Sequence, residues 1–411
     1  MKKLLILLLL MTIASLTLVA ETRTKGEVGI ESRYFSNDTI EETKDSNIAQ
    51  KARIEIRGNQ NNFYERLRVF GRADTTDHNR GVVVIEEAWY GYEKSNLNIK
   101  AGAQMLNWTA LEAFHPADML NSRNLDSNVE NAEKYGEPML SLNYLLEGGS
   151  VGVYYMPVMI DPNLPKKTNR LRFASFDTGS AIWIEEDGSI SADNRSDQFA
   201  LRVDKTFGPA DVSFHYLQHK DRSQPLLVLN SETTQFHPVY LPVKQVGGTL
   251  QYIISDFILK SEFAHRGFSK STNTHLGVLD QKDHYQLAFG GEYTFYHSSG
   301  KESGLLIEAQ TIQGVSKQER AALSLFQNDI LLGHRFVFND MSSSEFFTSL
   351  IVDLERSDEL LFSFSYSQRL GDTWKIQPGL RLVKGRSHSD GYGLQQIAES
   401  DQVFINLTRY F

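Results

Sequence analysis

The chain has 411 residues, of which 41% are hydrophobic and 23% charged, and its formal net charge at pH 7 is -9. It contains no cysteine, which excludes disulfides and thiolate metal sites, and its acidic balance argues against nucleic-acid binding. Beyond residue 20 no apolar run approaches the roughly 20 residues of a membrane-spanning helix, so a place in a membrane would require a barrel.

The first segment, residues 1–20, begins with Lys2 and Lys3, continues as an apolar run and ends on Ala20 before the charged Glu21. A basic start, an apolar centre and a small residue at the cleavage point are typical of a secretory signal peptide. The alternative is a membrane anchor. We therefore expect an exported protein whose mature part, residues 21–411, is one domain.

The mature part repeats one local pattern, in which about ten residues of alternating polarity are followed by a turn. The pattern predicts about eighteen antiparallel strands, with sixteen as the second choice. They lie near 25–36, 48–58, 62–73, 82–92, 96–104, 138–147, 149–157, 196–205, 210–220, 244–254, 256–266, 283–296, 303–313, 326–338, 344–355, 358–370, 372–384 and 401–411.

Short and long connections alternate between these strands. The short ones consist of residues that tolerate tight turns and lie at 58–62, 93–96, 147–150, 207–210, 255–256 and 371–372. The long ones lie at 37–47, 74–81, 105–137, 158–195, 221–243, 267–282 and 385–400. Turns on one side and loops on the other are what an outer-membrane barrel requires, whereas a soluble sandwich has no reason to separate them.

Alternate residues of the strands divide into an apolar and a polar face. The apolar faces, expected to meet lipid, include Phe199, Leu201, Val203, Val212, Phe214, Tyr216, Tyr285, Leu287, Phe289, Leu360, Phe362, Phe364 and Tyr366. The opposite faces carry side chains such as Ser363, Ser365, Lys375 and Arg381. Because a charge near mid-membrane costs roughly 2 to 4 kcal/mol on the lipid side, the polar faces predict a hydrated lumen.

Basic residues alternate on the inward faces expected for the early strands. The seven positions are Lys51, Arg53, Arg57, Arg66, Arg68, Arg72 and Lys100. In a wide barrel they would form a basic wall along one side of the lumen. The alternative is that they pair with Glu55, Glu87 and neighbouring acids. Seven bases against those two acids favour a residual positive field.

The third long connection, 105–137, breaks the strand rhythm and is acidic despite Arg123 and Lys134. Residues 109–114 are predicted to form a short helical turn that Pro116 ends. The carboxylates expected to matter most are Glu112, Asp118, Asp126 and Glu130. Glu112 and Asp118 are the two expected to face the basic wall.

The last strand ends the chain on Phe411, with Val403, Ile405 and Leu407 on one face. It resembles the closing strand of bacterial outer-membrane β-barrels, whose terminal Phe is part of the insertion signal. Arg409 departs from that pattern, in which an apolar or aromatic residue is usual. The resemblance implies that the third loop folds into the lumen, as in general porins, and creates a transverse field with the basic wall. The alternative is a loop that stays outside as a lid or an adhesion surface.

A narrower resemblance covers residues 100–157. The run Lys100-Ala-Gly-Ala-Gln-Met-Leu-Asn-Trp108 is followed by Phe114-His-Pro-Ala-Asp-Met-Leu120 and by a strand pair that ends at Pro157. These motifs are similar to those of a proteobacterial porin-like family of uncharacterised function. Thr109 stands where that family usually has Gly, and the resemblance implies nothing about the substrate.

Hydrolase chemistry has little support in the sequence. Ser213 and His215 alternate on one face, but residues i and i+2 of a strand lie about 6 to 7 Å apart, too far for a nucleophile to contact its base. A G-x-S-x-G motif is absent. His215, His219 and His334 are instead interpreted as polar lumen residues.

The sequence therefore predicts an all-β, antiparallel up-and-down barrel in the outer membrane of a Gram-negative bacterium. Its expected function is that of a porin, a passive channel for small hydrophilic solutes and ions with a possible anion preference. The alternatives are a plugged structural or adhesive barrel and a barrel hydrolase. We predict no catalytic residue, no metal site and no cofactor. The expected partners are lipid, lipopolysaccharide phosphates contacted by residues 166–172, small solutes, and two further copies in a homotrimer, with a monomer as the other state.

Overall fold

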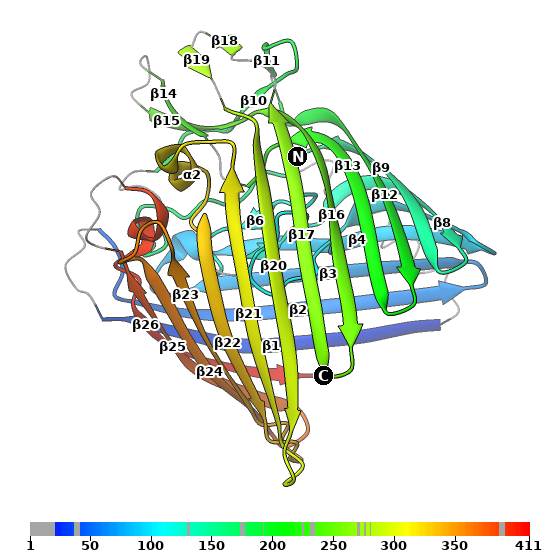
Figure 1. Cartoon of the computed structure of the whole chain (residues 1–411), viewed down its shortest axis with the longest axis vertical. Helices are drawn as coiled ribbons and strands as arrows, with labels where there is room; N and C mark the ends of the chain where they lie inside the picture. Colours follow the sequence, from blue (N-terminus) through cyan, green and yellow to red (C-terminus); the bar gives the residue numbers. More distant parts are fainter. Residues whose placement is uncertain are drawn as a thin grey trace.

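The computed structural model describes residues 21–36, 42–129, 132–172, 177–191, 193–223, 226–230, 235–268, 272–274, 277–279, 281–385 and 391–411. The predicted signal peptide, residues 1–20, lies outside this part. One antiparallel sheet of 18 strands dominates the described chain (Figure 1). The first strand pairs with the second and also with the last, so the sheet closes into a barrel.

The predicted count of eighteen strands is confirmed, and each predicted strand has a counterpart. In chain order the barrel strands are β1 (Glu21–Phe35), β2 (Ser46–Gln60), β3 (Phe63–Asp74), β4 (Val82–Lys94), β5 (Leu97–Gln104), β8 (Glu137–Leu146), β9 (Gly149–Val158), β12 (Arg195–Phe207), β13 (Ala210–Lys220), β16 (Pro242–Ile254), β17 (Phe257–Phe268), β20 (His284–Tyr296), β21 (Glu302–Gln313), β22 (Asn328–Val337), β23 (Glu345–Asp353), β24 (Leu360–Leu370), β25 (Trp374–Lys384) and β26 (Gln402–Tyr410).

The short connections gather at one end of the barrel, which we call the turn end. Each of the six turns predicted from sequence contains a residue with positive φ, at Asn61, Ser95, Gly148, Gly208, Ser255 and Gly371. This conformation costs little for Gly and is accessible to Asn. Tight turns of this kind hold neighbouring strands in antiparallel register.

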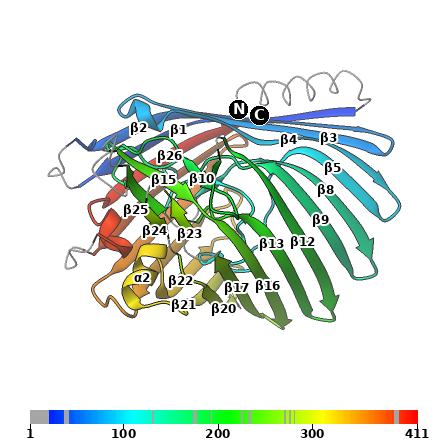
Figure 2. The same ribbon diagram turned by 90° about the horizontal axis from the view of Figure 1, so that it is seen from above.

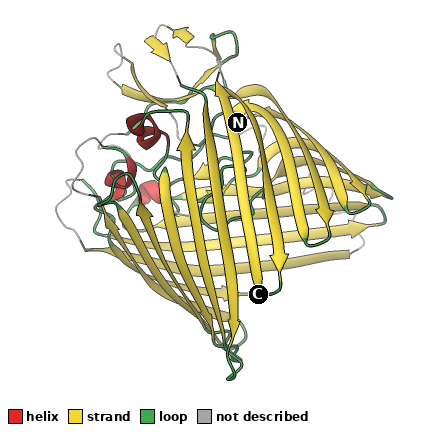
Figure 3. Cartoon of the chain, in the orientation of Figure 1, coloured by secondary structure: helices red, strands yellow, loops and turns green. Residues whose placement is uncertain are grey.

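The long connections gather at the other end, the loop end, together with the few helices (Figure 3). These are η1 (His78–Arg80), α2 (Lys317–Leu323) and η2 (Gly393–Ile397). A four-stranded sheet there comprises β10 (Ile182–Ile184), β11 (Ile190–Ser191), β14 (Leu226–Asn230) and β15 (Gln235–Tyr240), and β18 (Thr272–Thr274) pairs with β19 (Gly277–Leu279). None of the described helices has the length and hydropathy to cross a bilayer.

The two faces of the barrel wall have the expected character. Phe214 and Phe289, both predicted to meet lipid, point outward and are each 57% exposed. Val403, Ile405 and Phe411 of the last strand are exposed on the same outer surface. Apolar side chains on the outside suit a barrel surrounded by hydrocarbon, whereas the inside carries charged and polar side chains together with apolar clusters.

Candidate functional site

The basic wall lies on the lumen side of β2, β3 and β5. Cross-strand pairing places Lys51 opposite Arg72, Glu55 opposite Arg68 and Arg57 opposite Arg66, so these side chains share the inward face. Ile54 and Ile56 between them point outward. The period-2 alternation of β2 and β3 thus places five arginines and a lysine on one wall, and β5 adds Lys100.

A β-bulge in β4 brings two carboxylates to this wall. Arg68 pairs with Glu87 whereas Val69 pairs with Ile85, so Glu86 is an extra residue without its own partner. Such a bulge lets two consecutive side chains point to one face. Glu86 lies 2.9 Å from Arg53 and 2.7 Å from Arg68, and Glu87 lies 2.8 Å from Arg66.

Further acids neutralise most of the remaining charge on the wall. Glu27 of β1 pairs with Arg53, and Glu55 pairs with both Arg57 and Arg66. The arginines and glutamates of the wall therefore form a network of ion pairs. For these arginines the structure agrees with the alternative given above, in which the basic residues pair with Glu55, Glu87 and neighbouring acids.

Two lysines of the wall differ from the arginines. Neither Lys51 nor Lys100 makes an ion pair with any described residue. Lys100 lies instead over the ring of Trp89, with Nζ 4.7 Å from the centroid. The net positive charge of the wall thus resides mainly on these two side chains.

The third long connection crosses the lumen and reaches the opposite wall. Residues 105–136 include a small hairpin, β6 (Arg123–Asn124) and β7 (Glu133–Lys134). We call this segment the inward loop. Leu111 and Phe114 pack in a core cluster with residues of β20 to β25, while Trp108 and Leu120 pack against β8 to β13. The loop is thereby held on both sides of the barrel.

Two wall carboxylates hold the inward loop through its backbone. Glu262 of β17 accepts hydrogen bonds from the N–H groups of Ala110 at 2.6 Å, Leu111 at 3.0 Å and Ala117 at 3.2 Å. Glu308 of β21 accepts from Glu112 at 2.7 Å and Ala113 at 3.0 Å. Carboxylates that accept from several backbone N–H groups make strong, charge-assisted hydrogen bonds.

The predicted helical turn at residues 109–114 is wrong, because the chain there forms bends without a helix. The physical reason lies in the same hydrogen bonds. A single turn would leave its first N–H groups without intrahelical partners. The wall carboxylates Glu262 and Glu308 provide these partners from the opposite side of the lumen.

The four predicted loop carboxylates have different surroundings. Asp118 pairs within the loop, with Arg123 at 2.9 Å and with Lys134, and Glu112 lies 3.9 Å from Lys260 of β17. Neither is paired with the basic wall. Asp126 does reach it, 3.2 Å from Arg80 and 3.7 Å from Arg72. Burial raises the pKa of Asp126, and both arginines oppose that shift. Glu130 lies outside the described residues.

A buried ion-pair cluster ties the loop end of the basic wall together. Arg80 of η1 is fully buried and contacts Asp74 at 2.6 Å, Glu31 at 2.9 Å and Asp126 of the inward loop. Removing one partner from such a buried cluster lowers the free energy of unfolding by about 3 to 5 kcal/mol. Arg80 therefore anchors the Asp126 segment of the inward loop to the wall.

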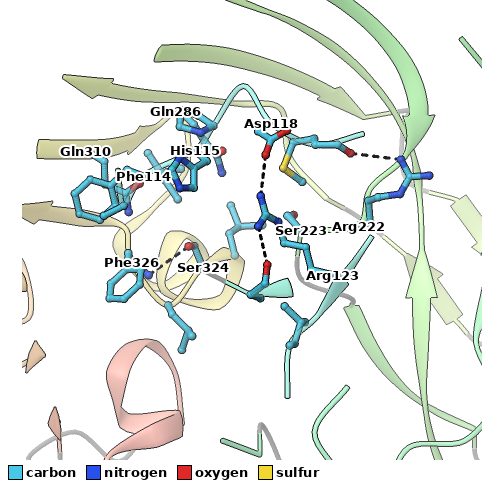
Figure 4. A pocket seen from close by; sticks show the side chains of 18 of the residues that line it. Phe114, His115, Asp118, Arg123, Arg222, Ser223, Gln286, Gln310, Ser324 and Phe326 are labelled. Carbon is cyan, nitrogen blue, oxygen red and sulfur yellow. Dashed lines mark hydrogen bonds and ion pairs between the residues drawn. The ribbon is translucent and has the colours of Figure 1, made fainter. Parts of the chain in front are cut away.

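The inward loop also borders a cavity of about 210 Å³ toward the loop end (Figure 4). Its lining combines loop residues Phe114 and His115, wall residues Gln286 and Gln310, and Phe326 after α2. A second cavity, of about 230 Å³, includes Glu112 and the wall residues Glu292, Glu302 and Arg335. The loop thus borders the first cavity with Phe114 and the second with the charged side chain of Glu112.

Ser213 and His215, the candidate nucleophile and base of a hydrolase, do not contact each other and have other partners. The Ser213 hydroxyl bonds Thr249 at 2.7 Å, and His215 contacts Gln245 at 3.1 Å and lies beside Trp108. The lumen position predicted for His334 is wrong. Its strand register puts it on the outer face opposite Leu305 and Thr348, because the inward positions of β22 are the odd-numbered ones.

Sequence reasoning missed the most important acids of the lumen, which are Glu27, Glu86, Glu262 and Glu308. Glu308 lies between the neutral residues Leu306 and Gln310 on the inward face of β21, and Glu262 lies between Lys260 and Ala264 on the inward face of β17. The consecutive pair Glu86 and Glu87 interrupts the alternation of β4, which is the sequence sign of the bulge. The partners themselves come from distant segments that alternation does not specify.

Comparison with known proteins gives a likeness in fold. No family model matches the sequence, and no curated protein matches it. Among solved structures, Pseudomonas aeruginosa OccK5 (OpdH) aligns with a TM-score of 0.51 and 10% identity over 96% of this chain and 98% of that one. Salmonella typhi OmpF in complex with daunomycin aligns with a TM-score of 0.49 and 11% identity over 95% of this chain and 97% of that one.

The alignment with OccK5 spans nearly the whole of both chains. At this low identity it concerns the path of the backbone, and it agrees with the closed sheet, the alternation of faces and the separation of turns from loops. The chain is a porin-like, closed antiparallel β-barrel of 18 strands.

Proposed function

We propose that this protein is an outer-membrane channel for the passive diffusion of small hydrophilic solutes, with a preference for anions. The observation that carries the proposal is the charged, polar lumen inside a closed barrel whose outer surface is apolar. A water-filled barrel of this kind passes solutes without a covalent step, and its lining charges bias which ions enter.

The anion preference is attributed to Lys51 and Lys100, because the arginines of the wall are paired with glutamates. For the double variant Lys51→Gln/Lys100→Gln we expect the ratio of anion to cation permeability to fall several-fold. The measurement is the reversal potential of single channels in a planar bilayer under a salt gradient.

The matched control is Arg195→Gln/Lys384→Gln, which removes two charges from exposed side chains at strand ends. Its reversal potential should equal that of the wild type. A Lys51→Gln/Lys100→Gln channel as anion-selective as the wild type would contradict the assignment of these lysines.

A second candidate function is a plugged structural barrel, which the two-sided packing of the inward loop favours. It predicts no conductance from the wild-type protein and conductance after deletion of residues 107–120. An open wild-type channel excludes it.

The remaining parts of the proposal concern assembly. Residues 1–20 would be removed on export, and Lys166 and Lys167 would contact lipopolysaccharide phosphates. Arg170 of the same segment is buried and pairs with Asp45 at 2.7 Å, so it takes no part in such a contact. The homotrimer is tested against the monomer by chemical cross-linking in detergent.

A further inference from the structure

The cavity of about 210 Å³ beside the inward loop has a polar stripe on its wall side. Arg266 of β17, Gln286 of β20 and Gln310 of β21 all line it and come from three neighbouring strands. The inward loop supplies His115 from the other side, as Figure 4 shows for His115, Gln286 and Gln310.

Arg266 lacks the partners that a buried guanidinium requires. Its side chain is only 3% exposed, and its one ion pair among the described residues is to Asp221 at 3.6 Å. Its Nε has no hydrogen-bond partner there. Buried polar groups are nearly always hydrogen-bonded, so such a group requires an explanation such as a bound ligand or water.

The other polar groups of this stripe are also short of partners. Nδ1 of His115 is buried without a hydrogen bond in the described chain, 4.0 Å from the Glu262 carboxylate, and the Gln310 amide reaches only Asp329, at 3.5 Å. All of these groups can donate a hydrogen bond. The cavity is therefore lined by several donors that lack a close hydrogen-bond partner among the described residues.

The acceptors that line the cavity are already occupied. Asp118 is paired with Arg123 and Lys134. The Asn121 side chain accepts from Leu106 and donates to two carbonyl groups. Of the three arginines in the lining, Arg123 pairs with Asp118 and Arg222 lies 3.8 Å from Glu137, whereas Arg266 has only the 3.6 Å contact with Asp221. A buried guanidinium with an unused Nε donor suits a ligand that accepts hydrogen bonds and carries negative charge.

We propose that this cavity binds an oxyanion group of a solute through the Arg266 guanidinium, the Gln286 and Gln310 amides and the His115 ring. The site deepens the proposed function, on which it rests, because it makes oxyanions the class of anion that the channel collects at its loop end. An arginine suits this ligand because its planar group donates to two oxygens at once.

The test is calorimetric titration of the purified, folded barrel in detergent with inorganic phosphate at constant ionic strength. Wild-type protein should show saturable binding. Arg266→Gln should weaken it at least about tenfold, because a charged hydrogen-bonding partner is lost. Gln286→Leu, which keeps the charge, should weaken it about two- to fivefold. Acetate in a parallel titration tells a phosphate ligand from a carboxylate ligand, and Arg266-dependent binding of either one supports the site.

Arg335→Gln is the matched control, since Arg335 faces the second cavity and not this one. Its affinity for phosphate should equal that of the wild type. If Arg266→Gln does not fold, as judged by circular dichroism, Gln286→Leu decides. Binding of neither anion to the wild type, or binding unchanged in Arg266→Gln, means that the cavity holds only water and overturns the proposal.

Conductance is measured separately on the same proteins. Binding without conductance would refute the channel and keep the site. Conductance without binding would refute the site and keep the channel.

Discussion

Individual carboxylates decide where the inward loop lies. Glu262 and Glu308 are buried in the lumen, and their oxygens are used by backbone N–H groups of the loop. Burying an ionised carboxylate is costly unless hydrogen bonds compensate it. The loop supplies these bonds, so each carboxylate and its loop segment depend on one another.

Replacement of Glu262 by Gln should loosen the inward loop. The amide keeps one acceptor oxygen but presents an NH₂ group to a backbone N–H, so at least one charged hydrogen bond, worth about 1.5 to 3 kcal/mol, is lost. We expect larger fluctuations of single-channel current. The measurement is open-channel noise in a planar bilayer.

The control for this prediction is Glu302→Gln on β21. Glu302 also faces the lumen, but its hydrogen bond is to Asn339 and not to the loop. Equal noise in Glu262→Gln and Glu302→Gln would show that Glu262 does not hold the loop.

Asp161, in the connection after β9, makes that loop sensitive to pH. Burial raises the pKa of Asp161 to about 6, and the charge of nearby Glu137 adds to the shift. A carboxyl whose folded pKa is raised stabilises the folded loop in its protonated form. This contribution is complete below about pH 4 and is lost as the pH rises through about 6.

We therefore expect residues 159–172 to exchange amide hydrogens faster at pH 7 than at pH 4, after correction for the intrinsic rate. Asp161→Asn, which cannot ionise, should remove most of the difference. The measurement is hydrogen exchange followed by mass spectrometry. A pH dependence that persists unchanged in Asp161→Asn would assign it to another group.

At the scale of the element, the bulge in β4 determines the charge of the basic wall. Without the extra residue Glu86, β4 would alternate regularly, with Ile85 outward and Glu87 inward. Deleting Glu86 should leave every other side chain of β4 on its present face. Arg53 and Arg68 would then lose the carboxylate that lies between them.

For this deletion we expect a folded barrel with a stronger anion preference and a lower thermal unfolding midpoint. The reversal potential and a circular dichroism melt measure the two effects. Glu86→Gln, which keeps the bulge and removes the charge, should show the same change in selectivity. A deletion that scrambles the barrel, so that no channel forms, would show that the bulge is needed for strand register.

The strands were predictable because alternation and turn residues are local properties. Ile54 and Arg53 differ in their faces because the pleat alternates, and Gly208 and Asn61 form turns because they tolerate positive φ. The bulge was not predicted, because regular alternation assumes that every residue of β4 has one partner on β3, and Glu86 has none. Its consequence, the neutralised arginines, was therefore left as an alternative.

At the scale of the whole molecule, the barrel and its inward loop were predictable to different degrees. The barrel was predicted from the repeated strand pattern, and the pairing of β1 with β26 closes it. The contacts of the loop join Ala110 to Glu262 and Glu112 to Glu308. No local pattern specifies such pairs, so the sequence predicted a loop in the lumen and not its partners on the wall.

Figure 2 shows the barrel from another direction, with α2 and the sheet of β10 and β15 on the side of the long loops. The cavity beside Arg266 is lined by residues of the inward loop, by wall residues and by Leu323 at the end of α2. Arg266 lies near the loop end of β17, and Lys51 and Arg72 lie near the loop end of β2 and β3, so a solute entering from that end would meet both the cavity and the basic wall.

The anchoring of the inward loop also has a consequence for the order of assembly. The hydrogen bonds of Glu262 and Glu308 to the loop join residues 145 to 196 positions apart. Contacts of such sequence separation form late, since the intervening chain has to be ordered first. We expect the nascent barrel to pair its strands around an unobstructed interior, and the pore to acquire its final bore only when β17 and β21 are in place.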